Sequence, residues 1–513
     1  MYANPNDIFY SPLQLFSIFL EPWYSVNLTV GLMLFAGYFG WVLFAKNVMQ
    51  LCGRWQHFFA FLITVNGFYF THVAVGHYNF FPFPLLGYLC WLLFERQRNT
   101  WIELIDKTAI FSLVTALIIY GAGYYVLSDF ILISVLFLPL DLCLAGKKYL
   151  SRVREMLQRI VCYGAGSILI CWSKILSAYN FLVISHYQVG AHQISAGQSV
   201  LRYILNAFWA LPQSNSLFLG VPWGLHEKSF YISHIVIIGL VLGLISVGIN
   251  RKNLLGGNIG IFITIYSFIV FGIFKQIIQA RGFVATLLFQ APIFSSYRVA
   301  TRFLYPLSLW LVFISVISLN AFFNSYAKKM ESTFIVVSMF ITVALFAVAY
   351  YPVMPTLALS VDYGRFVSDW RSRKGDYYSS SVSEIVNNGV NDFNYDHGSG
   401  IHCYDAIYIA MGGRQESILH LGPVTDIDNK SYNLINPSCF LYGKENNCKP
   451  WDRILVEDKR NFVDFTQGKP VEWKISTTQS VADMISKYFF YVFSAIFLGI
   501  TILRLVNKTA SRR

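Results

Sequence analysis

The chain has 513 residues, of which 55% are hydrophobic and only 13% are charged, whereas a soluble domain carries about 25% charged residues. This composition excludes an ordinary soluble protein, because so much apolar surface needs lipid as its solvent. The net charge is +12, yet Met354 to Met484 contains 13 Lys and Arg against 17 Asp and Glu. The positive charge therefore lies mostly in short loops between apolar segments, a pattern typical of membrane topology and not of a nucleic-acid partner.

Long apolar stretches recur along the chain and predict spanning helices, which need roughly 17 to 25 apolar residues. Some stretches are shorter and need neighbouring helices to complete the span. Examples are Val26 to Ala45, Phe58 to Phe70, Thr108 to Val126 and Ile261 to Phe274. The lipid bilayer is therefore the first expected partner, and the expected fold is an α-helical polytopic membrane protein.

Basic loops set the expected orientation, since Lys and Arg gather on the cytoplasmic side. They lie around Lys46 and Arg54, and at Arg96 to Lys107, Lys147 to Arg159, Arg251 and Lys252, Lys328 and Lys329, and Arg504 to Arg513. If all these loops lie in the cytoplasm, the chain crosses the membrane about 11 times, or about 12 times in a full-length form, and its N-terminus lies outside. We expect a multi-span region at 1–353, a soluble outer domain at 354–484, and a last helix with a basic tail at 485–513.

The outer domain contains short apolar runs broken by Gly, Asn, Asp and Pro, which favours a small β or mixed α/β domain. Three of the eight cysteines lie there, and Cys439 and Cys448 would close a small loop. An oxidising compartment favours a disulfide between these two residues. Two free thiols are the alternative, and a zinc site is less favoured because no second Cys or His pair has ligand spacing.

The first candidate site surrounds His72 and His77, where one helix is expected to break at the outer face and Pro82 and Pro84 begin the next. Two histidines five residues apart can bind a phosphate, a sugar hydroxyl or a metal ion. The alternative is that both are interfacial hydrogen-bonding groups. No metal ligands are assigned, although a divalent metal ion stays open as a cofactor.

The second candidate site contains Arg298 and Arg302, which are four residues apart and would share one face of a helix. Two guanidinium groups on one face can grip a phosphate bidentately. Lys174, near the outer end of an apolar helix, can add to this anion site, as can Lys275 and Arg281. The alternative for Lys174 and the arginines is that they snorkel to lipid headgroups.

Two acidic residues receive no functional role. Asp129 follows Ser128 and is expected to be a helix N-cap. Asp141 is expected to pair with Lys147 or Lys148.

Taken in order, these motifs resemble the polytopic GT-C-type glycosyltransferases of bacterial membranes. The resemblance covers roughly Met1 to Leu319. A Gly-His segment precedes a Pro-rich helix start at His72 to Pro84, and a Pro-x-Phe-x-x-x-Arg-x-x-x-Arg-Phe stretch opens a later helix at Pro292 to Phe303. Tyr2 to Pro12 is similar to the outer loop that follows the first helix of such proteins.

The resemblance implies transfer of a sugar from a polyprenyl-phosphate-linked donor to a cell-surface glycan, lipid or protein acceptor at the outer face of a bacterial inner membrane. The arginines, Lys174 and the histidines would hold the donor phosphate and stabilise its departing charge. In that family an acidic residue on the first outer loop is the general base. It usually follows a first spanning helix, which this chain lacks before Tyr2, so two explanations stay open: either an upstream segment is missing from this sequence, or the protein is not catalytic. Asp7 and Glu21 are the substitutes, and Asp7 is the better candidate.

Two other classes of function stay open. One is a non-catalytic assembly or translocation factor on the same scaffold. The other is a lipid or polysaccharide flippase or transporter, which would be built from two similar halves with broken helices.

Overall fold

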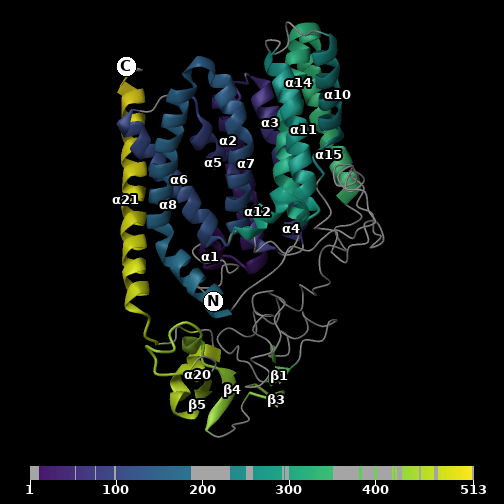
Figure 1. Cartoon of the computed structure of the whole chain (residues 1–513). Coiled ribbons are helices and arrows are strands. Elements are labelled where there is room, and N and C mark those ends of the chain that lie inside the picture. The colour runs from purple at the N-terminus through teal and green to yellow at the C-terminus, as the bar shows by residue number, and fades with distance from the viewer. Residues whose placement is uncertain are drawn as a thin grey trace. The chain divides into compact units, whose positions relative to one another are not determined.

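The structure is a computed structural model of the whole chain (Figure 1). It describes residues 11–51, 53–74, 77–97, 100–185, 231–249, 258–291, 294, 300–350, 381–383, 398–400, 419–420, 422–424, 430–449, 452–466, 469 and 472–510. The chain forms two compact units. The smaller unit contains Met1–Pro5, Trp172–Gln188 and Ser360–Ile485, and the larger unit contains Asn6–Cys171, Val189–Leu359 and Ser486–Arg513.

The described chain is mostly helical, as expected, and contains five helical stretches long and apolar enough to cross a membrane. A sixth candidate is a pair of helices bent by 62° at a short break. The five stretches are Trp23–Asn47, Tyr124–Val183, Leu304–Tyr326, Lys328–Val348 and Thr477–Asn507. The expected helical membrane protein is therefore confirmed, whereas the number of spans and the division at 353 and 484 stay predictions.

The first half of the chain forms a set of long helices interrupted by short ones. In chain order these are α1 (Pro12–Ser17), α2 (Pro22–Asn47), α3 (Arg54–Thr64), α4 (Gly67–Ala74), η1 (Tyr78–Phe80), η2 (Phe83–Leu85), α5 (Leu86–Phe94), α6 (Trp101–Tyr120), α7 (Tyr124–Ala145), η3 (Gly146–Lys148) and α8 (Tyr149–Ser185).

The second half of the larger unit is a further helix group (Figure 1). Its elements are α10 (His234–Ile249), α11 (Asn258–Ile278), α12 (Phe283–Gln290), η5 (Ala300–Phe303), α14 (Leu304–Tyr326), η6 (Lys328–Met330) and α15 (Glu331–Tyr350). Helix α21 (Thr477–Ala510) begins in the smaller unit and ends in the larger one.

Two expected spans are broken in the structure. The stretch Phe58 to Phe70 divides at Asn66, whose side-chain oxygen accepts from the Tyr69 amide at 2.9 Å and so starts α4. The stretch Thr108 to Val126 divides at a tight turn in which Ala122 has a φ of 61°. These turn and capping groups end the helices although the apolar pattern continues.

Small residues allow close packing of helices in the larger unit. A Cβ on Gly239 or Gly243 of α10 would lie within 2.4 Å of a serine hydroxyl on α14. The small-xxx-small spacing of these two glycines is typical of closely packed membrane helices. Glycines also line the contact between α2 and the η2–α5 segment, where a Cβ on Gly37 would lie 2.2 Å from Pro84 Cβ.

The described strands all lie in the smaller unit. Strand β1 (Ser381–Ser383) pairs in parallel with β2 (Gly398–Gly400) and antiparallel with β3 (Gly422–Pro423). A second, antiparallel pair joins β4 (Ser431–Ile435) to β5 (Arg453–Leu455). Three short helical turns or helices accompany them, namely η7 (Pro437–Phe440), η8 (Val456–Asp458) and α20 (Lys459–Thr466).

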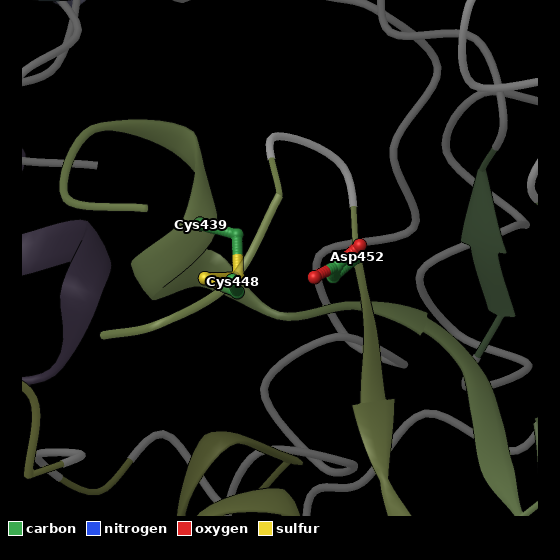
Figure 2. A group of neighbouring side chains, drawn as sticks. All are labelled: Cys439, Cys448 and Asp452. Atoms are coloured by element: carbon green, nitrogen blue, oxygen red, sulfur yellow. A yellow bond between two sulfur atoms is a disulfide. The ribbon is translucent and has the colours of Figure 1, made fainter. Parts of the chain in front are cut away.

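A small core and one disulfide stabilise the β4–β5 pair. Tyr432 stacks on Phe462 of α20 with ring centroids 3.7 Å apart. Cys439 and Cys448 form the expected disulfide in the loop between the two strands (Figure 2). The side chain of Asn446 forms two backbone hydrogen bonds with Lys474, so this loop is also tied to the segment before α21.

We expect Gly37→Ala to lower the free energy of unfolding by about 1–3 kcal/mol, because the new methyl group overlaps the backbone of Pro84. Gly31→Ala on the same helix is the matched control, since its Cβ would meet nothing within 4 Å. The control should be neutral or stabilising by up to about 1 kcal/mol. Thermal unfolding of both variants in detergent measures the difference, and equal melting temperatures would refute the close contact.

Candidate functional site

The first histidine of the predicted site is buried within the larger unit. His72 lies on α4 and is fully buried, and its Nδ1 donates to the carbonyl oxygen of Phe68 at 2.7 Å. Because a carbonyl can only accept, Nδ1 carries the proton and Nε2 of the neutral ring is an acceptor. Aromatic rings enclose the imidazole, with Phe68 and Phe80 centroids at 4.3 and 4.1 Å.

A short turn brings His77 back to His72. The His77 amide donates to the carbonyl of His72 at 2.9 Å, and the Phe80 amide donates to the carbonyl of His77 at 3.0 Å. The two imidazole centroids are consequently 5.5 Å apart. The expected helix break between these two histidines is therefore present, and it gathers both rings around Phe80.

Arg302 from the second predicted site reaches the same place. It lies on η5, and its guanidinium carbon is 5.4 Å from the Phe80 ring centroid and 4.9 Å from the Tyr125 ring centroid. Cation–π contacts of this length hold a guanidinium in place through its face. The structure thus joins His72, His77 and Arg302 around one aromatic ring, and we call these three side chains with Phe80 and Tyr125 the His–Arg cluster.

The expected N-cap role of Asp129 is wrong. Helix α7 already begins at Tyr124, and Asp129 lies in its second turn with only 1% of its surface exposed. It stands four residues after Tyr125 and therefore on the same face of α7. Asp129 also interacts electrostatically with the buried Tyr305 of α14. A buried carboxylate beside the His–Arg cluster is the feature that the sequence reasoning missed.

The cluster has the chemistry of an anion site. Imidazole and guanidinium groups donate hydrogen bonds to phosphate oxygens, and low-dielectric surroundings strengthen such contacts.

The remaining predicted residues are not joined to this cluster by the structure. Asp7 and Arg298 lie outside the described residues. Lys174 is on α8 in the smaller unit and is 2% exposed. Arg281 is exposed at the break between α11 and α12, where its amide donates to the carbonyl of Gln276 at 3.1 Å.

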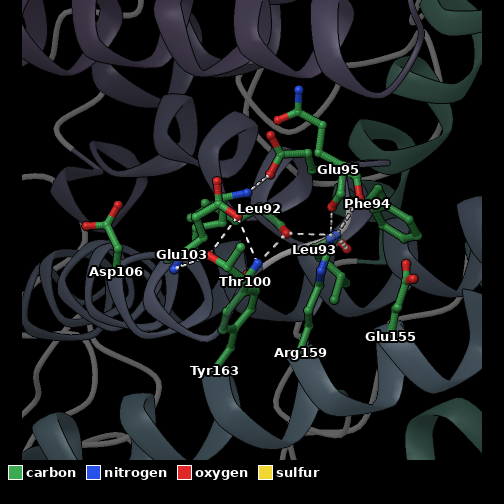
Figure 3. A network of polar contacts seen from close by, with 12 residues as sticks. Leu92, Leu93, Phe94, Glu95, Thr100, Glu103, Asp106, Glu155, Arg159 and Tyr163 are labelled. Carbon is green, nitrogen blue, oxygen red and sulfur yellow. Dashed lines mark hydrogen bonds and ion pairs between the residues drawn. The ribbon is translucent and has the colours of Figure 1, made fainter. Parts of the chain in front are cut away.

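A second polar network lies where α5 ends (Figure 3). Arg159 of α8 donates to the carbonyls of Leu93 at 3.0 Å and Gln97 at 2.8 Å. Arg152 donates to the carbonyl of Phe94 at 2.7 Å and to the carboxylate of Asp141 at 2.6 Å. Asp141 thus pairs with Arg152, so the expected lysine partners were wrong.

A buried ion pair completes this region. In it, Lys107 of α6 binds the carboxylate of Glu95. The guanidiniums supply donors to carbonyls that have no partner within α5, because a helix leaves its last carbonyls unsatisfied. We therefore interpret the network as structural.

Among the described residues one group has metal-ligand spacing, Cys439, Cys448 and Asp452 (Figure 2). The two sulfurs are bonded to each other, whereas a cysteine binds zinc only as a thiolate. This set therefore does not fit a zinc ion in the oxidised protein. A divalent metal ion as a cofactor, for which the sequence assigned no ligands, stays untested.

No protein family, curated protein or solved structure matches this chain.

We expect Asp141→Ala to lower the free energy of unfolding by about 3–5 kcal/mol, because it leaves Arg152 buried without its carboxylate. Glu155→Ala is the control. Its carboxylate is partly exposed and 3.7 Å from the same guanidinium, so its loss should cost less than about 1 kcal/mol. Chemical denaturation in detergent would contradict this interpretation if the two variants lost equal stability.

Proposed function

We propose that the protein is a GT-C-type glycosyltransferase of a bacterial inner membrane. It moves a sugar from a polyprenyl-phosphate-linked donor to a cell-surface glycan, lipid or protein acceptor. The observation that carries this proposal is the convergence of His72 and His77 with Arg302, which is more than 200 residues away in the sequence, near the buried Asp129. Two sequence motifs of the resemblance meet in one cluster, as a shared substrate site requires.

In this proposal the cluster holds the donor phosphate. The acceptor hydroxyl loses its proton to a carboxylate, and its oxygen attacks the anomeric carbon of the sugar. The bond from that carbon to the phosphate oxygen breaks, and the phosphate leaves with the electron pair. Arg302 and His77 stabilise this departing charge more strongly than the esterified phosphate of the bound donor, so they lower the barrier. His72, whose Nδ1 already donates to Phe68, packs against Phe80 beside them.

Asp7 and Asp129 have different roles in the proposal. Asp7 is the general base, as the resemblance implies. Asp129 is buried on the face of α7 that carries Tyr125 and does not lie on the first outer loop, where the resemblance places the base. It therefore acts as a positioning residue, which balances the positive charge of the His–Arg cluster and keeps the phosphate-binding groups in place.

A second candidate function is lipid or polysaccharide transport. The observation that favours it is the break between α11 and α12, which bends an apolar pair by 62° and exposes Arg281. Broken helices are common at the substrate sites of transporters.

We expect Arg302→Ala to lower kcat/KM for sugar transfer at least about 100-fold, the typical loss for one group that stabilises transition-state charge. Asp7→Asn should lower kcat about 100-fold or more, since it removes the base. Arg302→Lys should recover part of the activity because the charge is kept. The assay uses the full-length protein in detergent with radiolabelled polyprenyl-phosphate sugars and membrane extract.

Lys328→Ala, an exposed residue outside the cluster, is the control and should transfer sugar at the parent rate. If Arg302→Ala were as active as this control, the cluster would not hold the donor. If no donor supported transfer and Arg281→Ala abolished movement of a labelled lipid across vesicles, transport would replace the transferase.

A further inference from the structure

A pocket outside the His–Arg cluster lies between the start of α6 and the first half of α8. Its volume is about 310 Å³. It is lined by Thr100, Trp101, Leu104, Ser151, Arg154, Glu155, Gln158 and Arg159. Most of these side chains are polar, although both helices carry apolar residues on neighbouring surfaces.

The residues of α8 that line this pocket recur at helical spacing. Ser151, Arg154 and Gln158 are three, four and seven residues apart and so share one face of the helix. Arg154 is exposed, and within the described chain it forms no hydrogen bond or ion pair. A cationic side chain is therefore available to a ligand in this pocket.

Arg159 adds a second positive charge beneath the first. It is 2% exposed, donates to backbone carbonyls and interacts electrostatically with Glu95 and Glu155. Glu155 also lines the pocket and lies 3.7 Å from Arg152, which is already paired with Asp141. The lining thus carries two guanidiniums, Arg154 and Arg159, against one carboxylate. The pocket therefore has a positive excess and fits an anion.

The surface around the pocket is suited to lipid tails. Trp101 is 73% exposed, and Ile102, Leu150 and Leu157 are also exposed on the two helices. A tryptophan beside basic residues is typical of the level at which lipid headgroups meet the hydrocarbon region. A ligand that matches both parts is anionic at one end and apolar at the other.

Two acidic groups on α6, Glu103 and Asp106, lie outside the pocket lining. Asp106 is buried and is bound by Arg504 of α21 at 2.6 Å. Glu103 accepts hydrogen bonds from the backbone and side chain of Thr100, which together form a capping box at the start of the helix. The helix start is thereby stabilised beside the pocket.

We infer that this pocket binds the headgroup phosphate of an anionic phospholipid from the surrounding bilayer. Arg154 contacts the phosphate directly, with Ser151 and Gln158 as hydrogen-bonding partners, and Arg159 supplies background positive charge. Basic pockets between membrane helices bind anionic headgroups in this way. The site is independent of the proposed transferase site, because it shares no residue with the His–Arg cluster.

The test measures binding of phosphatidylglycerol to the full-length protein in nanodiscs by native mass spectrometry, with phosphatidylcholine as the neutral lipid. We expect Arg154→Ala to weaken retention of phosphatidylglycerol about tenfold, as loss of one charge-assisted hydrogen bond implies. Arg154→Lys should retain part of the binding. Lys148→Ala is the matched control, because Lys148 is exposed on the preceding turn but does not line the pocket.

Three outcomes would overturn the inference. In the first, Arg154→Ala retains phosphatidylglycerol as well as the parent does. In the second, Lys148→Ala loses as much binding as Arg154→Ala, which would show only non-specific attraction of charge. Inorganic phosphate could also displace the lipid at equal concentration, which would indicate a free-phosphate site. A melting curve of each variant without added lipid checks that Arg154→Ala folds as the parent does.

Discussion

The carbonyl groups at the end of α5 impose the strongest constraint on the larger unit. This helix has only 9 residues, and its last carbonyls lie among buried side chains where an unsatisfied polar group is costly. Arg152 and Arg159 reach them from α8, and Arg152 is itself held by Asp141 of α7. The end of α5 is therefore joined to α7 and α8, which lie later in the chain, and α5 gains a fixed end.

A fixed α5 also determines where the His–Arg cluster lies. The chain runs from His77 through η1 and η2 directly into α5, so the turn that carries Phe80 cannot move far from the arginine network. On the other side, the absence of a side chain at Gly37 lets α2 approach Pro84 closely. Phe83 stacks on Phe80 at 4.9 Å and contacts Tyr305 at 5.1 Å. Packing thus holds Phe80 in place, and His72, His77 and Arg302 all contact its ring.

The sequence predicted the helical membrane fold and both motifs of the cluster, because apolar length and polar residues at expected helix breaks are local signals. It did not predict Asp129 or the partner of Asp141. Ser128 and Asp129 have the pattern of an N-cap, but the turn at Ala122 starts α7 earlier and places Asp129 inside the helix. Lys147 and Lys148 are nearer to Asp141 in sequence, whereas Arg152 lies where its guanidinium can reach Asp141 and the end of α5 together. Such choices depend on contacts between distant segments.

The arginines of the larger unit differ in what they contact, and this difference separates their roles. Arg152 and Arg159 direct their N–H groups at carbonyls and a carboxylate, which are permanent parts of the fold. Arg302 instead lies against the faces of Phe80 and Tyr125. These ring contacts place the guanidinium of Arg302 against Phe80, the ring that both imidazoles also contact. Arg152 and Arg159 stabilise a helix end, whereas Arg302 brings a positive charge to two histidines, and this juxtaposition supports the proposal of a substrate site at the His–Arg cluster.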